Sequence, residues 1–351
     1  MASTPPYVSI VTWGRNDGYT HDYIPRVSRA TSCLATQFER AGIASEIIIV
    51  EWNPMPGRPL LVETLDLPQH LHHVTIRGII VDAKHHVHLA GASERGLHAG
   101  EAANVGIRRA QGSFVTPKAS DTFFSPQLIA RLARQDLDPD GMYRADRHDI
   151  RVPDDAVRNL DGDTLLATLE SLPSVPQKWI DQMPYWHLRD LHTNACGDFT
   201  LLGAAYWHLL RGHPYDKTVL SLDIDSIVMH AAAAHGVQEY RWPADCKIYK
   251  PVHANLNAAR ITQVWKPWQR LLDQRLADHI SPKAAHWMRV LFDYPQRKVR
   301  GVESIIGPSI ERNLVRPASR WARGAYPIPT QPENWGLADE NLEERVLCSA
   351  D

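Results

Sequence analysis

The first third of the chain alternates short apolar runs with stretches of helical apolar spacing. Residues 7–12, YVSIVT, are rich in β-branched side chains, and residues 24–42 carry apolar side chains at helical spacing. Residues 45–50, SEIIIV, are almost wholly apolar, as in a strand that is buried on both faces of a parallel sheet. Strand, helix and strand in this order predict a βαβ unit.

The same alternation continues to about residue 135. Further strand-like runs lie at residues 74–76, 78–81 and 113–116, and residues 100–110 have helical spacing with small side chains on one face. The pattern predicts an α/β fold in which helices flank an open, mostly parallel, Rossmann-like sheet.

The rest of the chain has a different character. Pro and Asp cluster in residues 136–176 around a weak helical pattern, helical patterns dominate residues 199–236, and residues 247–249 are strand-like. Long helical patterns fill the last hundred residues. We therefore expect residues 1–135 and 136–255 to be two halves of one domain, followed by a helical C-terminal extension at residues 256–351.

Composition narrows the class of protein. With 351 residues, 44% of them hydrophobic, the chain can bury a full core, and a formal net charge of -2 gives no basic field for a nucleic-acid partner. The four cysteines match neither a zinc site nor a secreted disulfide framework, which favours a reducing compartment. Because we find no signal peptide and no run of about 18 apolar residues, we predict a cytoplasmic protein.

One part of the C-terminal region is locally basic. Cations outnumber three carboxylates between residues 283 and 323; they are Arg289, Arg297, Lys298, Arg300, Arg312, Arg316, Arg320 and Arg323. One interpretation is a solvated helix face. The other is a surface that approaches anionic lipid or a phosphorylated acceptor, which would make the protein peripheral to the inner face of a membrane.

Polar loops follow the first two predicted strands, at the edge where open α/β sheets bind ligands. Asn16 could hydrogen-bond a base or ribose, Arg15 could meet a phosphate, and Glu51 could bind ribose or uracil. The candidate nucleotide-binding residues are Thr12, Gly14, Arg15, Asn16, Glu51 and Asn53. Alternatively the first loop only caps the following helix. No G-x-G-x-x-G follows either strand, which argues against a dinucleotide dehydrogenase.

Residues 91–126 carry the most informative pattern, GASERGLHAGEAANVGIRRAQGSFVTPKASDTFFSP. A basic residue, A-x-N-x-G-I-x-x-A-x-G, an apolar strand and an acidic residue before F-S-P resemble the donor-binding core of family 2 glycosyltransferases of the GT-A fold. The resemblance implies that Asn104 belongs to the helix beneath a nucleotide-sugar donor, and that the donor contacts Arg95, Ser120 and Asp121. It also implies that Asp121 binds a divalent metal ion, Mg²⁺ or Mn²⁺.

The chain departs from this family pattern at Ala119, where the family's D-x-D or N-x-D element has an acidic or amide residue. One carboxylate can still hold Mg²⁺ or Mn²⁺, because these ions keep several waters and bridge to substrate phosphates. Alternatively Lys118 or Arg95 supplies the positive charge that a leaving diphosphate requires. Asp121 could also be only a turn carboxylate at the end of a strand.

A second segment resembles the acceptor-side loop of a bacterial branch of the same superfamily. Residues 192–200, HTNACGDFT, contain G-D-F before a helix, and W-x-x-L-R-G-x-P follows at residues 207–214. The residues that the resemblance places near the acceptor are His192, Asn194, Gly197 and Asp198.

The family pattern then calls for an acidic pair at the start of a helix, and Asp223 and Asp225 supply it. We predict Asp225 as the catalytic base, with Asp223 as the second candidate, because a carboxylate can deprotonate a sugar hydroxyl at hydrogen-bond distance. Alternatively both aspartates only favour the positive end of the helix dipole.

Two further groups of residues carry charge or a metal-ligand side chain. GT-A enzymes often have a metal-binding His after the next strand, so the resemblance implies that His253 completes a metal site with Asp121, although a lone His is also commonly structural. The related branch tends to have a histidine where this chain has Lys250. Residues 143–149 combine cations and carboxylates, which indicates either a salt-bridge network or arginines near the diphosphate.

The resemblance therefore implies a glycosyltransferase of polysaccharide biosynthesis. It would move a sugar from a nucleoside-diphosphate donor, expected to be a UDP-sugar, to a hydroxyl of a glycan, lipid-linked or other acceptor by a single inverting displacement. Residues 334–337 would close over the substrates.

Two alternative functions remain open. A nucleotidyltransferase should carry a Gly-rich basic loop after the first strand, whereas residues 12–17 contain a single glycine. A non-catalytic nucleotide- or glycan-binding protein would account for Ala119 and Lys250 at expected ligand positions.

Overall fold

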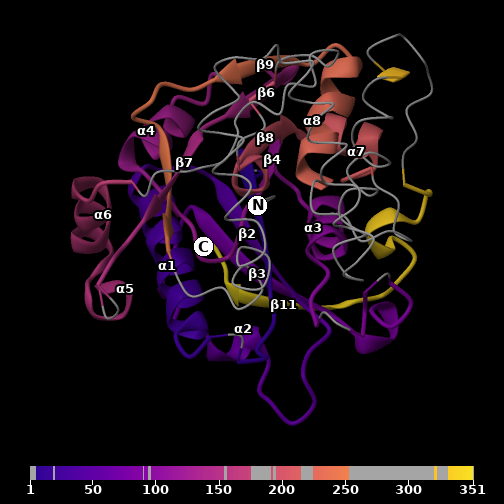
Figure 1. Ribbon diagram of the computed structural model, residues 1–351, viewed down its shortest axis with the longest axis horizontal. Coiled ribbons are helices and arrows are strands. Elements are labelled where there is room, and N and C mark those ends of the chain that lie inside the picture. The colour runs from indigo at the N-terminus through magenta and orange to yellow at the C-terminus, as the bar shows by residue number, and fades with distance from the viewer. Residues whose placement is uncertain are drawn as a thin grey trace, which may run out of the picture.

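The computed structural model describes residues 5–18, 20–89, 91–93, 96–153, 156–174, 191–192, 195–214, 224–252, 320–321 and 331–350. Its centre is an eight-stranded sheet with the order β11-β3-β2-β1-β4-β8-β6-β9, and a smaller three-stranded sheet has the order β5-β10-β7 (Figure 1). Helices pack on both faces of the large sheet, which confirms the predicted α/β architecture.

The strands of the large sheet are β1 (Val8–Gly14), β2 (Ser45–Trp52), β3 (Val74–Val81), β4 (Phe114–Pro117), β6 (Gly141–Arg144), β8 (Thr200–Gly203), β9 (Gln238–Arg241) and β11 (Glu343–Cys348). The small sheet consists of β5 (Phe123–Phe124), β7 (Asp146–Ile150) and β10 (Lys247–Pro251). The α-helices are α1 (Tyr23–Arg40), α2 (Leu61–Thr64), α3 (Ala99–Arg108), α4 (Pro126–Ala133), α5 (Ala156–Asn159), α6 (Gly162–Ser171), α7 (Ala204–Leu210) and α8 (Ile224–Ala234). Short 3-10 helices are η1 (Ala83–His85), η2 (Cys196–Asp198) and η4 (Trp335–Leu337).

Four neighbouring strands, β3-β2-β1-β4, run parallel and form the middle of the large sheet. β2 is buried along its whole length, as its apolar sequence predicts. The two short runs expected at residues 74–76 and 78–81 are one strand, β3. Gly78 lies within β3 because Val62 of α2 packs against it, and a Cβ at this position would lie 2.8 Å from the Val62 Cγ1.

The second half of the sheet is mixed. β8 pairs antiparallel with both β4 and β6, and β6 pairs parallel with β9. β6 and β7 lie within residues 136–176, which the sequence analysis interpreted as loops around one helix. The strand expected at residues 247–249 is present as β10, and it pairs with β7 and β5 in the small sheet.

Two apolar layers hold the helices against the large sheet. On one face, Phe38 of α1 and Leu128 of α4 belong to a single buried cluster with side chains of β1 and β2. On the other face, Val105 of α3 and Trp207 of α7 pack with α8 against the same strands. The sheet is therefore covered on both sides, and only its edges and strand ends are left uncovered by these two layers.

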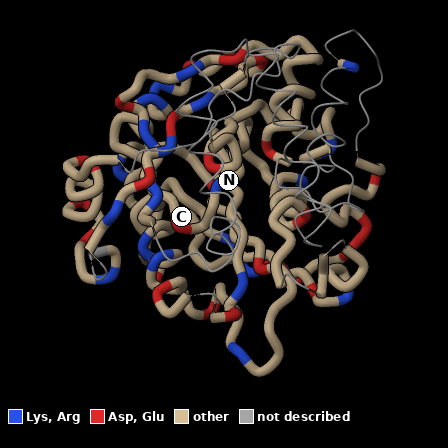
Figure 2. Tube along the Cα trace, in the orientation of Figure 1, with Lys and Arg blue, Asp and Glu red and all other residues tan. Residues whose placement is uncertain are grey.

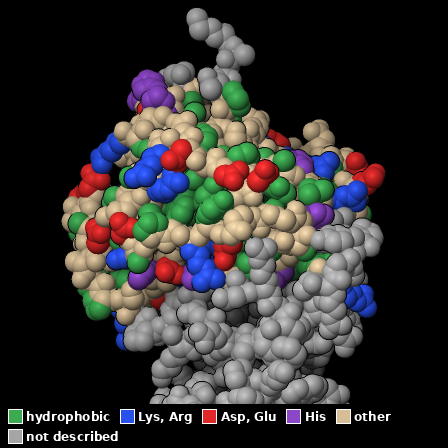
Figure 3. All heavy atoms as spheres, turned by 90° about the horizontal axis from the view of Figure 1, so that it is seen from above, with side chains coloured by type: hydrophobic (Ala, Val, Ile, Leu, Met, Phe, Trp, Pro, Cys, Tyr) green, Lys and Arg blue, Asp and Glu red, His purple; other side chains and the backbone are tan. Residues whose placement is uncertain are grey.

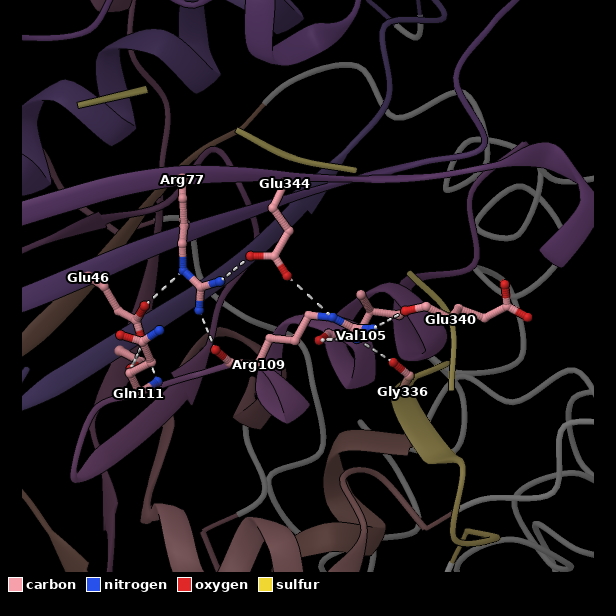
Figure 4. Close-up of polar contacts among 9 residues, drawn as sticks. Glu46, Arg77, Val105, Arg109, Gln111, Gly336, Glu340 and Glu344 are labelled. Carbon is pink, nitrogen blue, oxygen red and sulfur yellow. Dashed lines mark hydrogen bonds and ion pairs between the residues drawn. The ribbon is translucent and has the colours of Figure 1, made fainter. Parts of the chain in front are cut away.

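The described end of the expected helical extension is a strand. β11 pairs antiparallel with β3, so it forms one edge of the large sheet. Arg77 of β3 lies between Glu46 of β2 and Glu344 of β11, with ion-pair distances of 3.0 and 2.7 Å (Figure 4). Arg109, just after α3, donates to the Gly336 carbonyl at 2.6 Å. The residues from 331 onward thus bind both the sheet edge and α3.

The surface mixes side chains of both signs. Positions of Lys and Arg and positions of Asp and Glu are scattered over the whole described trace (Figure 2), and Figure 3 shows one face on which acidic, basic and hydrophobic side chains are interspersed. This mixture is in keeping with the small formal net charge of -2. Within the described ranges, every helix is too short or too polar to cross a bilayer.

Candidate functional site

The order of the parallel strands places a ligand-binding edge between β1 and β4. The chain passes from β1 to β2 and β3 on one side, and then returns to add β4 on the other side of β1. Open α/β sheets bind ligands outside the carboxyl ends of the strands at such a switch of direction. Arg15 and Asn16 follow β1, and residues 118–121 follow β4, so the two predicted loops lie side by side at this edge.

The loops after β1 and β2 are joined by hydrogen bonds. Arg15 donates through Nε to the Asn53 carbonyl at 2.6 Å, and Asn53 donates through Nδ2 to the Gly96 carbonyl at 2.9 Å. A Cβ at Gly96 would collide with the Arg15 guanidinium, so a glycine permits this close approach. Asn16 donates to the Pro59 carbonyl at 2.9 Å. Arg15, Asn16 and Asn53 are therefore brought together, as expected, at the carboxyl edge.

Thr12, Gly14 and Glu51 are predicted to contact a nucleotide, but all three are buried in the protein. Glu51 is completely buried, and its Oε2 accepts a hydrogen bond from the Val62 N–H at the start of α2 at 3.3 Å. Burial raises the pKa of this carboxyl. Thr12 is buried within β1. Gly14 leaves room for the Tyr23 hydroxyl, which a side chain at this position would strike.

Asp121 lies between two cations. The Arg26 Nε is 3.5 Å from its Oδ2, and the Lys250 Nζ is 3.6 Å from its Oδ1. Arg26 is fixed in turn by Asp22, at 2.5 Å. Next to Asp121, Ser120 shares a hydrogen bond of 3.2 Å with the Tyr23 hydroxyl. The β4 loop is therefore tied to α1 on one side and to β10 on the other.

A second buried carboxylate, Asp198, continues this charged cluster. Its Oδ1 accepts from the Ala119 N–H at 3.3 Å, and its Oδ2 accepts from Arg147 at 2.6 Å. Burial alone would raise the pKa of Asp198, but the neighbouring Lys250 and Arg147 hold it below the usual value. Arg147 of β7 thus belongs to a salt-bridge network, and that network touches the predicted site.

Lys118 is a buried amine beside the same carboxylates. Its Nζ donates to the Ala119 carbonyl at 2.8 Å. Burial lowers the pKa of Lys118 to about 8, against the raising influence of Asp121 and Asp198. Such a shift away from the ordinary value is common at functional sites and also occurs in structural ion networks.

Asp225 is reached through η2. Gly197 precedes Asp198, and a Cβ on Gly197 would lie 2.6 Å from the Asp225 Oδ2, so the carboxylate rests directly against this glycine. The Asp225 Oδ1 also accepts from the N–H of the next residue, Ser226, at 2.9 Å. Burial raises the pKa of Asp225 above its ordinary value, which makes the carboxylate a stronger base.

Two predicted residues have structural partners away from this cluster. Asn104 of α3 is fully buried, and its Oδ1 accepts from the His213 N–H at 2.7 Å, which joins α3 to the turn after α7. His192 lies 2.7 Å from Asp146 through its Nε2, and its backbone N–H donates to Glu239 at 2.8 Å.

Four predicted residues lie outside the described part of the chain: Arg95, Asn194, Asp223 and His253. The described residues include no group of three His, Cys, Asp or Glu side chains arranged to hold a metal ion. The surroundings of Asp121 do not fit a divalent ion, because each carboxylate oxygen has a cation beside it, and Ala119 has no side-chain ligand atom and its carbonyl already accepts from Lys118. The role of His253 as a metal ligand stays a prediction.

Sequence reasoning missed Tyr23 and Arg26, which the first turn of α1 carries to the site. One signal was available. Arg26 falls on the apolar face of the predicted helix, four residues after Asp22, and a cation on a buried face requires an acidic partner. That the second partner would be Asp121 depends on the packing of α1 against the β4 loop.

No protein-family model and no curated protein matches this chain. Among solved structures, it is similar to S. aureus TarS. TarS 1-349 in complex with UDP-GlcNAc aligns with a TM-score of 0.45 and 13% identity over 90% of this chain and 87% of that chain. The complex of TarS 1-349 with UDP aligns with a TM-score of 0.42 and 11% identity, over 90% of this chain and 87% of that chain. A further TarS structure aligns with a TM-score of 0.42 and 12% identity over 90% of this chain and 52% of that chain. This chain therefore spans only about half the length of that TarS chain.

Proposed function

We propose that the chain is a glycosyltransferase that moves a sugar from a nucleoside-diphosphate donor, a UDP-sugar in the first instance, to an acceptor hydroxyl. One observation supports this most. The β4 loop with Asp121 lies at the switch point beside the β1 loop, and contacts through Asp198 and Gly197 lead from it to Asp225. In this proposal, these contacts bring the cations for a diphosphate and the carboxylate base into one site.

The donor side of this proposal uses the loops after β1 and β2. Arg15 and Asn53 are held together by a hydrogen bond of 2.6 Å, which limits the entropy lost when a ligand binds there. Asn16 and Arg15 offer the amide and guanidinium groups that suit a nucleoside and a phosphate. Glu51 supports these loops from beneath by anchoring the start of α2.

The proposed reaction is a single inverting displacement. Asp225 accepts the proton of the acceptor hydroxyl, and that oxygen attacks the anomeric carbon from the face opposite the leaving group. The bond between this carbon and the diphosphate oxygen breaks, and the nucleoside diphosphate leaves with the electron pair. No step runs through the expected divalent ion, because the described partners of Asp121 are cations.

The acceptor side is less defined than the donor side. Gly197 and Asp198 lie next to Asp225, where an acceptor hydroxyl would have to be. A glycan or a lipid-linked saccharide supplies such a hydroxyl. Peripheral membrane contact through residues 283–323 belongs to this proposal, and apart from residues 320–321 that segment lies outside the described ranges.

Donor binding provides the first test. Purified protein should melt at a higher temperature in the presence of UDP or UDP-GlcNAc, because a ligand at about 100 times its Kd adds about 2.7 kcal/mol to the free energy of unfolding. Adenosine and guanosine diphosphates serve as the comparison panel. An unchanged melting temperature with every nucleoside diphosphate would contradict the proposal.

Asp225→Asn tests the chemical step. The substitution removes the base and keeps the shape, so transfer should fall by about 10²–10⁴-fold while UDP still binds. Asp163→Asn is the matched control, because Asp163 forms only a solvent-exposed ion pair with Arg40 of α1. Turnover of purified Asp225→Asn at the wild-type rate would exclude Asp225 as the base.

A non-catalytic nucleotide-binding protein is the second candidate. Ala119 and the ion-paired state of Asp121 favour it, because both remove ligand atoms that a metal-dependent transferase would use. Such a protein would bind UDP-sugars and neither hydrolyse nor transfer them. Release of UDP from a UDP-sugar over hours, measured with wild type and Asp225→Asn, separates the two functions.

A further inference from the structure

Asp121 is already neutralised by groups of this chain. One carboxylate oxygen has the Arg26 Nε at 3.5 Å, and the other has the Lys250 Nζ at 3.6 Å. A divalent ion that binds Asp121 would have to displace Arg26 or Lys250 from the carboxylate. The displaced cation would then still lie close to the metal ion. Like charges at such distances repel, and Mg²⁺ or Mn²⁺ sites in proteins use carboxylates and water as ligands.

The wider cluster is also balanced in charge. Its four carboxylates are Asp22, Asp121, Asp149 and Asp198, and its four cations are Arg26, Lys118, Arg147 and Lys250. The sum of four negative and four positive charges is zero, so these groups offer no surplus negative charge to attract a metal ion. A diphosphate can therefore be bound only if one of these cations exchanges its carboxylate partner for the phosphate groups.

Lys250 is the cation best able to change partners. Its side chain is 25% exposed, whereas the Arg26 side chain is 3% exposed and is also held by Asp22 at 2.5 Å. A lysine carries a point charge on a flexible four-carbon stem, so it can turn from one anion to another at little cost. Arg26 would keep Asp121 compensated when Lys250 leaves it.

We propose that Lys250, which pairs with Asp121 in the free protein, leaves this carboxylate to bind the diphosphate of the donor, and that the protein therefore binds its donor without a divalent metal ion. This inference rests on the proposed function, because it takes the ligand to be a nucleoside diphosphate. In this proposal Asp121 has a positioning role. Its carboxylate pairs with Lys250 and keeps the amine at the switch point until the donor binds.

The first experiment compares UDP binding with and without metal. Isothermal titration of the full-length protein in EDTA should give a Kd within about threefold of that in MnCl₂. A Kd at least about tenfold weaker in EDTA would overturn the inference. If no nucleoside diphosphate binds in either buffer, the proposed function fails as well; binding in MnCl₂ alone overturns only the metal-free site.

Variants of Lys250 identify the group that meets the phosphates. Lys250→Met should weaken UDP binding by about tenfold or more and leave uridine binding unchanged, because only the diphosphate loses a partner. Lys250→Arg keeps the charge and should retain most of the affinity. Lys84→Met is the control, because Lys84 pairs with Glu340 on the exposed surface. Equal UDP affinity of Lys250→Met and wild type would refute the proposal.

Asp121→Asn gives opposite results for the two kinds of site. If Asp121 only positions Lys250, the neutral side chain of Asp121→Asn no longer holds this cation. UDP should then bind the variant in EDTA at least as tightly as it binds wild type. If Asp121 holds a metal ion, the amide should abolish the advantage of MnCl₂ and weaken binding. A melting curve checks that the variant is folded, and the Lys250 variants decide the matter if it is not.

Discussion

His213, in the turn after α7, is a buried imidazole with a structural task. Its ring centroid lies 5.3 Å from that of Trp207, and its Nδ1 is 3.2 Å from the Ile224 carbonyl oxygen. Its backbone N–H binds the Asn104 side chain. Burial lowers the pKa of His213 to about 4, so the ring is neutral in the folded protein near pH 7.

Acid should therefore weaken the fold through His213. The pKa of the ring returns from about 4 to about 6.5 on unfolding, so between these pH values the unfolded chain binds more protons and stability falls as the pH falls. At pH 5 the loss is on the order of 2 kcal/mol. Melting temperatures at pH 7 and pH 5 should differ less for His213→Asn than for wild type.

His72→Asn is the control for this pH dependence, because His72 is exposed. His230 also has a pKa lowered to about 4 by burial, so part of the acid sensitivity should remain in His213→Asn. The same fall in melting temperature for His213→Asn and wild type would show that the ring is not held neutral.

At the scale of elements, the approach of α3 to the sheet depends on one glycine. Gly106 lies in the middle of the helix, and a Cβ there would collide with Val11 of β1 and come within 3.1 Å of Val50 of β2. An exposed helical glycine destabilises its helix by about 1 kcal/mol relative to alanine. Here close packing against the strands outweighs that propensity.

Gly106→Ala should therefore destabilise the protein by about 1–3 kcal/mol, because the helix must move away from β1. Gly162→Ala is the matched control. Gly162 begins α6, its nearest neighbouring atom would be 3.7 Å from a new Cβ, and the change should be neutral or slightly stabilising. Urea unfolding of both variants measures the difference. A stabilised Gly106→Ala would mean that α3 is not packed as closely as this.

Elements with strong periodicity could be predicted from the sequence, and elements with charged strands could not. β2 and α1 have long apolar patterns that only one structure satisfies. β7, with the sequence DRHDI, and the edge strand β11, with EERVLC, have charged side chains where a buried strand would have apolar ones. Their pairing comes from partners elsewhere in the chain, which local patterns do not record.

The candidate site divides in the same way. Asp121, Arg15 and Asn53 could be predicted because they follow recognisable strands, and the strand ends place them at one edge. Their partners could not. That Lys250 would face Asp121 depends on the antiparallel pairing of β10 with the two-residue strand β5, which leaves almost no signal in the sequence.

At the scale of the whole molecule, Glu46 joins segments that are distant in sequence. It is buried, and it accepts hydrogen bonds from Ser9 at 2.5 Å, from Arg77 at 3.0 Å and from the backbone of Gln111 (Figure 4). Arg77 continues the network to Glu344. The Glu46 carboxylate therefore joins β2, on which it lies, to β1, to β3 and to the loop before β4.

Replacing only one member of the Glu46–Arg77 pair should lower the free energy of unfolding more than replacing both. Arg77→Met leaves Glu46 buried without its cation, and the expected loss is about 3–5 kcal/mol in the free energy of unfolding. Adding Glu46→Gln to Arg77→Met should recover part of it. The control Arg345→Met breaks a solvent-exposed pair with Glu63, which water and salt screen, and should cost much less than Arg77→Met. Equal losses for the two arginine variants would contradict the buried network.

The position of β11 also sets a condition on biosynthesis. A ribosome makes β3 early, but the strand that covers its free side is encoded by residues 343–348. Until those residues emerge, the nascent sheet presents unpaired backbone groups that other polypeptides can bind. The free side of β3 is therefore protected only after residues 343–348 have been made and have paired with it.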